Sequence, residues 1–361
     1  MPGPKFDESE LEVVFTLPEN PRMKAVDIFK YPVTSAEAVR ALYNREPIWQ
    51  ISGLDSKFFS PAVYPDNVAR AFVYEATPFD NTTQGGGKDM FGVEWEYVPL
   101  VNGSMVKPGQ PLFSDANEWK SKLKKPNIAS WDWAGSAAAN NGTYLTPQTW
   151  NNCWLLNGWF ERMISWMDFD NAAVALIDPD QKEAVQEMLE WLTDVYIELA
   201  DKFIETYPGI DEFYVHDDWG AQKDTFFSPE VGREMLVPSM KRFVKHLHDQ
   251  GFVVELHSCG ANEKQIENFI EMGFDSWAPM SAINDTVMLY EKYGDQIVIG
   301  VAAKPFAADA SEAEQRARAR EYVEMFCKPN KPSMLSFDTM SMLTPAFREE
   351  LYKCSRIAYC G

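Results

Sequence analysis

From residue 180 onward the sequence alternates between helix and strand patterns, and this alternation limits the possible folds more than any other feature. Apolar residues at helical spacing run through Gln181–Tyr207, and Pro208-Gly209 stops the pattern. A second helix is predicted from the Ser228-Pro229 cap to about Gln250. Further helices are predicted at Glu263–Met272, Val287–Tyr293, Glu312–Phe326 and Pro345–Ile357. The strands predicted between the helices are Glu212–Asp217, Phe252–His257, Phe274–Ala278, Gln296–Val301 and Ser333–Asp338.

Strands that alternate with helices at this density indicate parallel βαβ units. Five strands follow residue 210 and the earlier residues have room for three more, so a single (β/α)8 TIM barrel of the α/β class is expected. A doubly wound open sheet is the structural alternative. Residues 1–170, rich in Pro, Gly, Asn and Trp, are expected to form an irregular N-terminal elaboration, and 171–361 the regular part. Because no repeat or linker interrupts the sequence, one domain over 1–361 is expected.

The composition argues against several kinds of partner. A formal net charge of −21 argues against nucleic acid and against an anionic membrane surface, because both require clustered Lys and Arg. The acidic start of the sequence is opposite to a secretory signal peptide, and no run of about 18 uncharged apolar residues could span a bilayer. The five cysteines are scattered and odd in number, so they predict no disulfide framework and suit a reducing cytoplasm.

In a TIM barrel the active site lies at the C-terminal ends of the strands. Two predicted strand ends carry polar side chains there, in His216-Asp217-Asp218 and in His257-Ser258-Cys259. Since side chains alternate between the two faces of a strand, every second residue is expected to point into the barrel. The residues predicted on that inner face are Tyr214, His216, Asp218, Glu255, His257, Cys259, Ser336 and Asp338.

His257 and Cys259 form a candidate metal site. His-X-Cys at a strand end places an imidazole and a thiol on one face, about 6 to 7 Å apart along the chain, and a zinc ion could bridge them. A hydrogen-bonded core histidine beside a buried cysteine is the alternative. His246 and His248 lie on a charged predicted helix, where a solvated surface role is expected.

Asp217 and Asp218 are candidates for a general acid or base, because paired carboxylates in a desolvated site repel and one pKa rises toward neutrality. One of the two is expected to cap a loop or bind backbone amides, and the alternation favours Asp218 as the chemical one. Most tryptophans are expected in the core, while a minority at the barrel mouth would suit an aromatic ligand. The tryptophans in or near loops are Trp49, Trp95, Trp131, Trp133, Trp154, Trp159, Trp166 and Trp219.

These segments resemble the uroporphyrinogen decarboxylase superfamily, and more closely its corrinoid-dependent methyltransferase branch. The resemblance is carried by HDDWGAQ (216–222), SPEVGREMLVPSMKR (228–242) and GFVVELHSCG (251–260), within a matching run from about Trp154 to Ile357. Weaker similarity extends to REPIW (45–49) and DMFGVEW (89–95). The family fold is a single TIM barrel, as the alternation predicts.

The resemblance implies a zinc site with His257 and Cys259 as ligands, completed by a cysteine after the last strand. That stretch contains no cysteine here, so either Asp338 is the third ligand or the site is altered or empty. Decarboxylation of uroporphyrinogen is argued against by Gln50–Ser56 (QISGLDS), because the decarboxylases carry arginines there for the porphyrin carboxylates.

The resemblance implies methyl transfer from a small methoxylated or methylated compound, with an aromatic methyl ether favoured, to the Co(I) of a separate corrinoid protein. Co(I) is a strong nucleophile, but an alkoxide or phenolate leaves only if its oxygen is protonated or bound to a Lewis acid. The expected catalytic residues are Asp218, His216 and Asp217. The expected substrate contacts are Tyr214, Trp219, Gln222 and Trp133.

Two alternative functions stay open at this point. A metal-free decarboxylase or lyase of a small acid would use Asp218 and His216 and would need no corrinoid protein. A non-catalytic binding protein on the same barrel would bind its ligand without turnover. The sequence leaves open the methyl donor, the third zinc ligand and whether the protein forms a homodimer.

Overall fold

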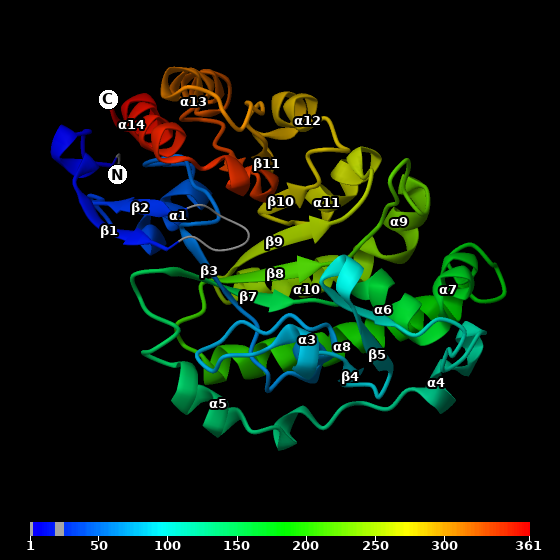
Figure 1. Ribbon diagram of the computed structural model, residues 1–361. Coiled ribbons are helices and arrows are strands. Elements are labelled where there is room, and N and C mark those ends of the chain that lie inside the picture. The colour runs from blue at the N-terminus through cyan, green and yellow to red at the C-terminus, as the bar shows by residue number, and fades with distance from the viewer. Residues whose placement is uncertain (1–2, 19–24) are drawn as a thin grey trace. The chain divides into compact units, whose positions relative to one another are not determined.

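The computed structural model describes residues 3–18 and 25–361, and the chain contains two compact units (Figure 1). Unit 1 comprises Met1–Lys57, Pro147–Trp150 and Asp275–Gly361. Unit 2 comprises Phe58–Thr146 and Asn151–Phe274. This division leaves the prediction of one domain over residues 1–361 untested.

Unit 1 is built on short parallel strands that are each followed by a helix. Strand β10 (Ser276–Pro279) pairs with β11 (Val298–Val301), and β11 pairs with β12 (Met334–Leu335). The helices that follow them, close to their predicted bounds, are α12 (Thr286–Tyr293), α13 (Glu312–Phe326) and α14 (Pro345–Cys360). The other elements are η1 (Glu8–Leu11), the antiparallel pair β1 (Val13–Leu17) and β2 (Val26–Phe29), α1 (Ser35–Tyr43) and η6 (Phe337–Met342). Strand β3 (Ser56–Phe59) runs across the boundary into unit 2.

The predicted strand Ser333–Asp338 is wrong at its C-terminal end. β12 has two residues and the 3-10 helix η6 follows it. The backbone turns because the Ser336 carbonyl accepts a hydrogen bond from the Thr339 N–H at 2.9 Å. Strand alternation therefore does not extend to Asp338, whose exposed carboxylate accepts hydrogen bonds from the N–H and the hydroxyl of Ser281 at 3.0 and 2.7 Å.

Unit 2 contains three longer parallel strands, β7 (Trp150–Leu155, whose first residue belongs to unit 1), β8 (Glu212–His216) and β9 (Val253–Ser258). Their register sets Trp154 beside Tyr214 and His216 beside His257. The helices between and after the strands are α6 (Trp159–Met167), α7 (Phe169–Ala175), α8 (Lys182–Thr206), α9 (Pro229–Met235), α10 (Val237–Asp249), η5 (Glu263–Gln265) and α11 (Ile266–Met272). The elements before β7 are α2 (Pro65–Ala69), α3 (Asn81–Gln84), β4 (Gly87–Lys88), β5 (Glu94–Val98), η2 (Pro99–Val101), β6 (Gly103–Val106), η3 (Ala116–Glu118), α4 (Trp119–Lys122), η4 (Ile128–Ser130) and α5 (Trp133–Asn140).

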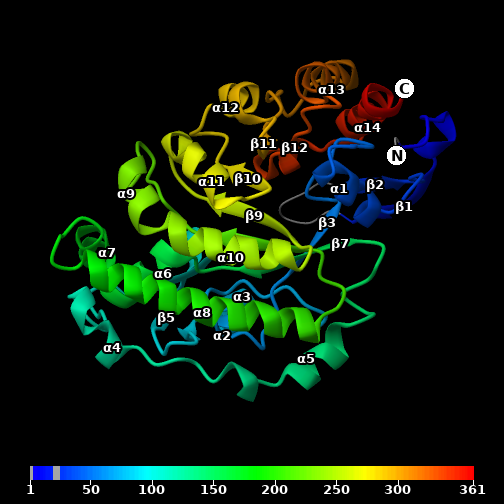
Figure 2. The ribbon, with the colours of Figure 1, turned by 180° about the vertical axis from the view of Figure 1, so that it is seen from behind.

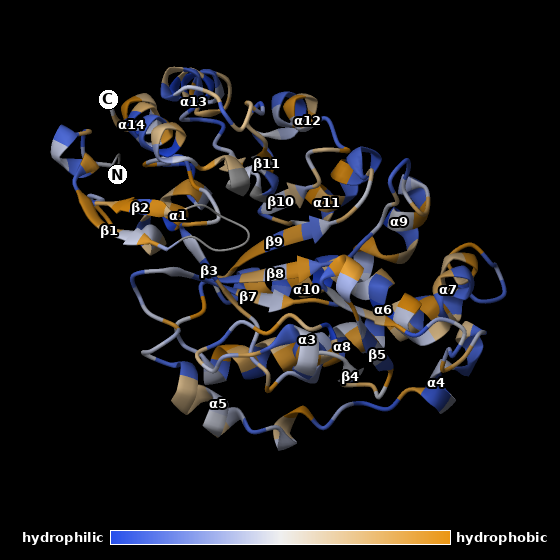
Figure 3. Ribbon diagram, in the orientation of Figure 1, coloured by the Kyte–Doolittle hydropathy of each residue, from blue (hydrophilic) through white to orange (hydrophobic). Residues whose placement is uncertain are grey.

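The long helix α8 buries the predicted apolar stripe. The stripe residues at helical spacing, all buried, are Val185, Met188, Leu189, Leu192, Tyr196, Leu199 and Phe203. Figures 1 and 2 show α8 and α10 along the same side of β7, β8 and β9, so the opposite side of these strands is left for other side chains. In Figure 3 the body of β9 is hydrophobic and its C-terminal end is hydrophilic, which marks the strand end as a polar site.

The single helix predicted from Ser228 to Gln250 is two helices, α9 and α10. Ser228 caps α9 as predicted, because its hydroxyl accepts a hydrogen bond from the Val231 N–H at 3.4 Å. The break lies at Leu236, two residues before Pro238. Proline has no N–H for the helical ladder and disfavours helical geometry in the preceding residue, so a continuous helix is interrupted here.

The chain has the α/β, TIM-barrel-like fold that the alternation predicts, with parallel strands followed by helices in both units. The strands and helices before β7 are short, in keeping with the predicted irregular N-terminal part. None of the helices within residues 3–18 and 25–361 has both the length and the apolar content needed to cross a membrane.

Candidate active site

The C-terminal ends of β8 and β9 bring aromatic and imidazole rings together on one face. Phe213 and Val215 are fully buried whereas Tyr214 and His216 are partly exposed, so the predicted alternation along β8 is confirmed. The ring centroids of His216 and His257 lie 5.0 Å apart, and the ring of Tyr214 is stacked 6.1 Å from that of His257. The two strands therefore present one continuous row of rings.

The two imidazoles meet two further side chains of kinds that can bind a metal ion. One ligand atom from each of His216, Asp218, His257 and Cys259 lies within 4.8 Å of all the others. Nε2 of His257 lies 3.1 Å from Sγ of Cys259, and Nε2 of His216 lies 3.8 Å from Oδ1 of Asp218. Asp218 Oδ1 also accepts a hydrogen bond from the Cys259 N–H at 2.6 Å, which ties the two strand ends together. We refer to these four residues as the donor cluster.

Two glycines allow the loops after β8 and β9 to approach each other. Gly260 has a φ of +94°, and a Cβ there would lie 2.2 Å from the backbone of Gly220. The Ala261 N–H donates to the Ala221 carbonyl at 2.8 Å between the same loops. The glycines that end HDDWG and HSCG are thus required for the close approach that assembles the donor cluster.

Glu161, an acid that the sequence reasoning missed, contacts His216 from α6. Its Oε2 lies 2.7 Å from Nδ1 of His216, and its Oε1 accepts a hydrogen bond from Arg70 at 3.1 Å. Arg70 also donates to Asn157 Oδ1 at 3.2 Å. The side chains of Glu161, Arg70 and His216 are only 11%, 14% and 15% exposed. The one available signal was position, since Glu161 lies in the first helical turn after β7, beside the expected active-site end of the barrel.

Neighbouring charges set the ionisation of this pair. Burial opposes the charged form of Glu161, but Arg70 and His216 outweigh it and lower its pKa to about 2. Burial also disfavours a charged His216, yet Glu161 and Asp218 raise its pKa well above the ordinary 6.5. Burial raises the pKa of the Cys259 thiol, and the hydrogen bond from His216 opposes that rise. Without further charges, the imidazole of His216 can therefore hold two protons beside an ionised Glu161.

Asp217 caps helix α6. Its fully buried carboxylate accepts hydrogen bonds at 3.1, 3.2, 2.9 and 2.8 Å from the backbone N–H groups of Trp159, Phe160 and Glu161 and the indole N–H of Trp219. Gly158 makes room for it, because a Cβ there would lie 2.2 Å from that of Asp217. Burial and then repulsion from Glu161 raise the pKa of Asp217 to about 7, against these donors. Asp217 thus binds backbone amides, the role expected for one of the two aspartates.

The other predicted site residues lie in varied surroundings. Trp219 is 1% exposed, and Trp133 is 5% exposed and donates its indole N–H to the Ile128 carbonyl at 2.7 Å. Such burial leaves little surface for a ligand. Gln222 is exposed in the loop after β8, and Asp338 belongs to unit 1. The roles predicted for these four residues stay predictions.

Trp154 of β7 extends the row of rings. Its ring stacks on Tyr214 with centroids 4.8 Å apart and an interplanar angle of 20°. The rings of Phe58 and Tyr74 lie 4.5 and 5.8 Å from it. Trp154 and Tyr214 are partly exposed, so they offer an aromatic surface that leads along the strands to His257.

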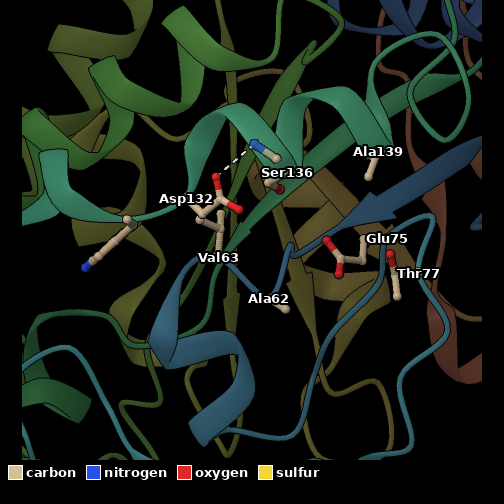
Figure 4. A pocket seen from close by; sticks show the side chains of 9 residues that line it. Ala62, Val63, Glu75, Thr77, Asp132, Ser136 and Ala139 are labelled. Carbon is tan, nitrogen blue, oxygen red and sulfur yellow. Dashed lines mark hydrogen bonds between the residues drawn. The ribbon is translucent and has the colours of Figure 1, made fainter.

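Unit 2 also has an open pocket of about 510 Å³, and none of its lining residues belongs to the donor cluster (Figure 4). Its two acids serve local structure. Asp132 accepts a hydrogen bond from the Gly135 N–H at 3.0 Å at the start of α5, and Glu75 accepts one from Asn140 at 3.3 Å. The donor cluster, in which ligand atoms face one another, is therefore the stronger candidate for chemistry.

Comparisons with known proteins agree with the fold and the motifs. A family model described as Uroporphyrinogen decarboxylase (URO-D) matches residues 161–333. The resemblance to the uroporphyrinogen decarboxylase superfamily is confirmed. This URO-D segment contains Glu161 and the whole donor cluster. A methyltransferase from Methanosarcina mazei has a similar fold, with a TM-score of 0.59, 14% identity, and coverage of 90% of this chain and 98% of that chain. No curated protein matches the sequence.

Proposed function

We propose that the chain is a methyltransferase that moves a methyl group from a small methoxylated or methylated compound to the Co(I) of a separate corrinoid protein. The favoured donor is an aromatic methyl ether. The URO-D match and the fold similarity to a methyltransferase support the proposal. The observation that carries it is the donor cluster, whose four ligand atoms lie within 4.8 Å of one another at the strand ends.

The donor cluster fits a zinc ion by its chemistry. Imidazole, thiol and carboxylate groups are the ligands that zinc takes, at bonds of about 2.0 to 2.3 Å, so its donors must lie a few Å apart as these do. His257 and Cys259 would hold the ion together with a third residue. Bound there, zinc would act as a Lewis acid toward the oxygen of the methyl ether. Asp338 as the third ligand stays a prediction.

We propose that Asp218 serves the leaving oxygen. Transfer breaks a carbon–oxygen bond and forms a carbon–cobalt bond, so cobalt goes from Co(I) to Co(III) and the alkoxide or phenolate must gain a proton. The Asp218 side chain is 29% exposed against 15% for His216, and its Oδ1 is held by the Cys259 N–H. In its protonated form the carboxyl group of Asp218 would deliver that proton to the leaving oxygen and become a carboxylate.

The aromatic surface of Trp154 and Tyr214 supports an aromatic methyl donor. Both rings are partly exposed, and Tyr214 is the neighbour of His257 in the row. A donor ring packed against the exposed edges of these rings would place a methoxy substituent toward the donor cluster. The decarboxylase activity of the family's name is not proposed, because Gln50–Ser56 contains no arginine for a porphyrin carboxylate.

Methyl transfer to free cobalamin tests the proposal. The zinc-loaded protein would be mixed with cob(I)alamin and 2-methoxyphenol, and methylcobalamin would be followed by its absorbance and catechol by chromatography. We expect the two products in equal amounts, and loss of both in Cys259→Ala. The variant Asp201→Asn, which alters an exposed acid on α8, is the matched control and should react as the wild type does.

No methylcobalamin from 2-methoxyphenol, methanol or methylamine would contradict the proposal. Turnover of a small acid without cobalamin would instead favour the lyase alternative. Ligand binding without either reaction would favour the binding-protein alternative.

A further inference from the structure

We infer that His216 is the third protein ligand of the zinc site and that Glu161 is the positioning residue that makes it one. This inference rests on the zinc site of the proposed function. His216 would take the role of the third ligand, for which residues 335–340 contain no cysteine. It leaves Asp218 free to act on the substrate. Three protein ligands with an open fourth position are the arrangement of catalytic zinc sites.

The contact with Glu161 decides which nitrogen of His216 faces the donor cluster. Glu161 is paired with Arg70 and is therefore a carboxylate, which can only accept hydrogen bonds. Nδ1 of His216, 2.7 Å from Oε2, must then carry the proton. In the neutral ring the lone pair lies on Nε2, the atom 3.8 Å from Asp218. Histidines that bind metals commonly donate their other ring N–H to a carboxylate in this way.

Glu161 is itself held in place from several sides. Its backbone N–H donates to Asp217 at 2.9 Å, and Arg70 holds its carboxylate. Arg70 donates to Asn157, which in turn donates to the fully buried Asp66 at 2.9 Å. Because Glu161 is held in this way, its contact fixes the ring of His216, which then loses little further freedom when a metal binds.

The chain offers a matched control for this contact. His246 Nε2 and Asp201 Oδ1 are also 2.7 Å apart and join α10 to α8. That pair is more open, with side chains 29% and 50% exposed, and neither residue belongs to the donor cluster. Removing either carboxylate deletes the same kind of contact, but only Glu161 is expected to matter for metal binding.

Zinc affinity measured by competition with a chromophoric chelator tests the inference. We expect Glu161→Ala to bind zinc about 10- to 100-fold more weakly than the wild type, the usual cost of losing the partner of a metal-bound histidine. Glu161→Gln, whose amide oxygen can still accept the Nδ1–H, should lose less. Asp201→Ala, which removes the control contact in the same way, should bind zinc as the wild type does. The visible spectrum of the cobalt(II)-substituted protein should change in His216→Ala and not in His246→Ala.

Three results would overturn the inference: no zinc binding by the wild type, wild-type affinity in Glu161→Ala, or an unchanged cobalt spectrum in His216→Ala. If Glu161→Ala fails to fold by circular dichroism, Glu161→Gln and the cobalt spectra decide. Zinc binding that depends on His216 and Glu161, found without methyl transfer to cobalamin, would support this inference and refute the proposed function.

Discussion

Two groups of charged side chains lie in unit 2, and they differ in how completely their members are paired. In the first, Arg162 is fully buried and donates to Asp66 and, at 2.8 Å, to Asp89. Both aspartates have further donors, such as the Tyr64 hydroxyl at 2.9 Å from Asp66 and the Trp95 indole at 3.1 Å from Asp89. These hydrogen bonds all come from groups inside the protein, and Arg162 supplies a counter-charge to both acids, so this network has no need of a ligand.

The donor cluster is the second group, and its members are partly exposed. It consists of two imidazoles, a thiol and a carboxylate, all of which are groups that bind zinc. These groups have no guanidinium among them to balance the carboxylate, so a bound cation would complete the cluster. A buried network whose hydrogen bonds are all made inside the protein stabilises the fold, whereas a partly exposed group of ligand atoms at a strand end is suited to chemistry. Substitutions in the two groups should therefore affect different measurements.

The largest expected effect on stability is that of Arg162→Met. Removing Arg162 leaves Asp66 and Asp89 buried without their counter-charge, and breaking a buried ion pair in this way costs about 3 to 5 kcal/mol. Urea unfolding measures the free-energy difference. Arg242→Met, which removes an exposed pair with Glu190 and Asp194, is the matched control and should cost at most about 1 kcal/mol. Equal losses of unfolding free energy in the two variants would show that the buried network stabilises the fold no more than the exposed ion pairs do.

The neighbours Asp217 and Asp218 give the next largest contrast. Asp217→Asn places an amide against N–H donors at the start of α6 and should cost about 1 to 3 kcal/mol of unfolding free energy. Asp218→Asn should change stability little but slow methyl transfer about 100- to 10,000-fold, the usual contribution of a general acid. Urea unfolding and methylcobalamin formation measure the two effects. Slow methyl transfer in a stable Asp217→Asn, together with a loss of stability in Asp218→Asn, would show that the two residues have the opposite roles.

The sequence predicted that the four residues of the donor cluster lie on one face of two strands, although it grouped only His257 and Cys259 as metal ligands and added Asp338 to them. β8 has five residues and β9 has six, so alternation fixes the facing of His216 and His257, while Asp218 and Cys259 just beyond the strand ends are held by the hydrogen bond between them. β12 has two residues, and the turn at Ser336 ends the pattern before Asp338. Alternation is thus informative along a strand of five or six residues and close to its end, and it fails after a two-residue strand that runs into a turn.

Glu161 could not be predicted by periodicity, because its contact with His216 joins residues 55 positions apart. That contact depends on where α6 begins, which Gly158 and the carboxylate of Asp217 set together. The element types came from local patterns, whereas this side-chain pairing comes from tertiary packing. A pattern along one strand or one helix contains no information about such a contact.

The smallest expected effect is that of Glu10 in unit 1. It tests whether an ion pair there also affects stability and nothing else. Glu10 accepts hydrogen bonds from Arg356 at 2.8 and 2.9 Å and from the Tyr352 hydroxyl at 2.6 Å. Burial opposes its charge, but Arg356 and Tyr352 outweigh burial and lower its pKa below the ordinary 4.5.

A group with a lowered folded-state pKa stabilises the fold above its unfolded pKa, and this contribution is lost as the pH falls through the folded value. The difference in unfolding free energy between the wild type and Glu10→Gln should therefore be greatest above the ordinary pKa of 4.5 and shrink as the solution is made more acidic. Urea unfolding of both proteins over this range measures it. A difference that grows on acidification would show that Glu10 is not stabilised as a carboxylate, and the pairing rule drawn from unit 2 would not extend to unit 1.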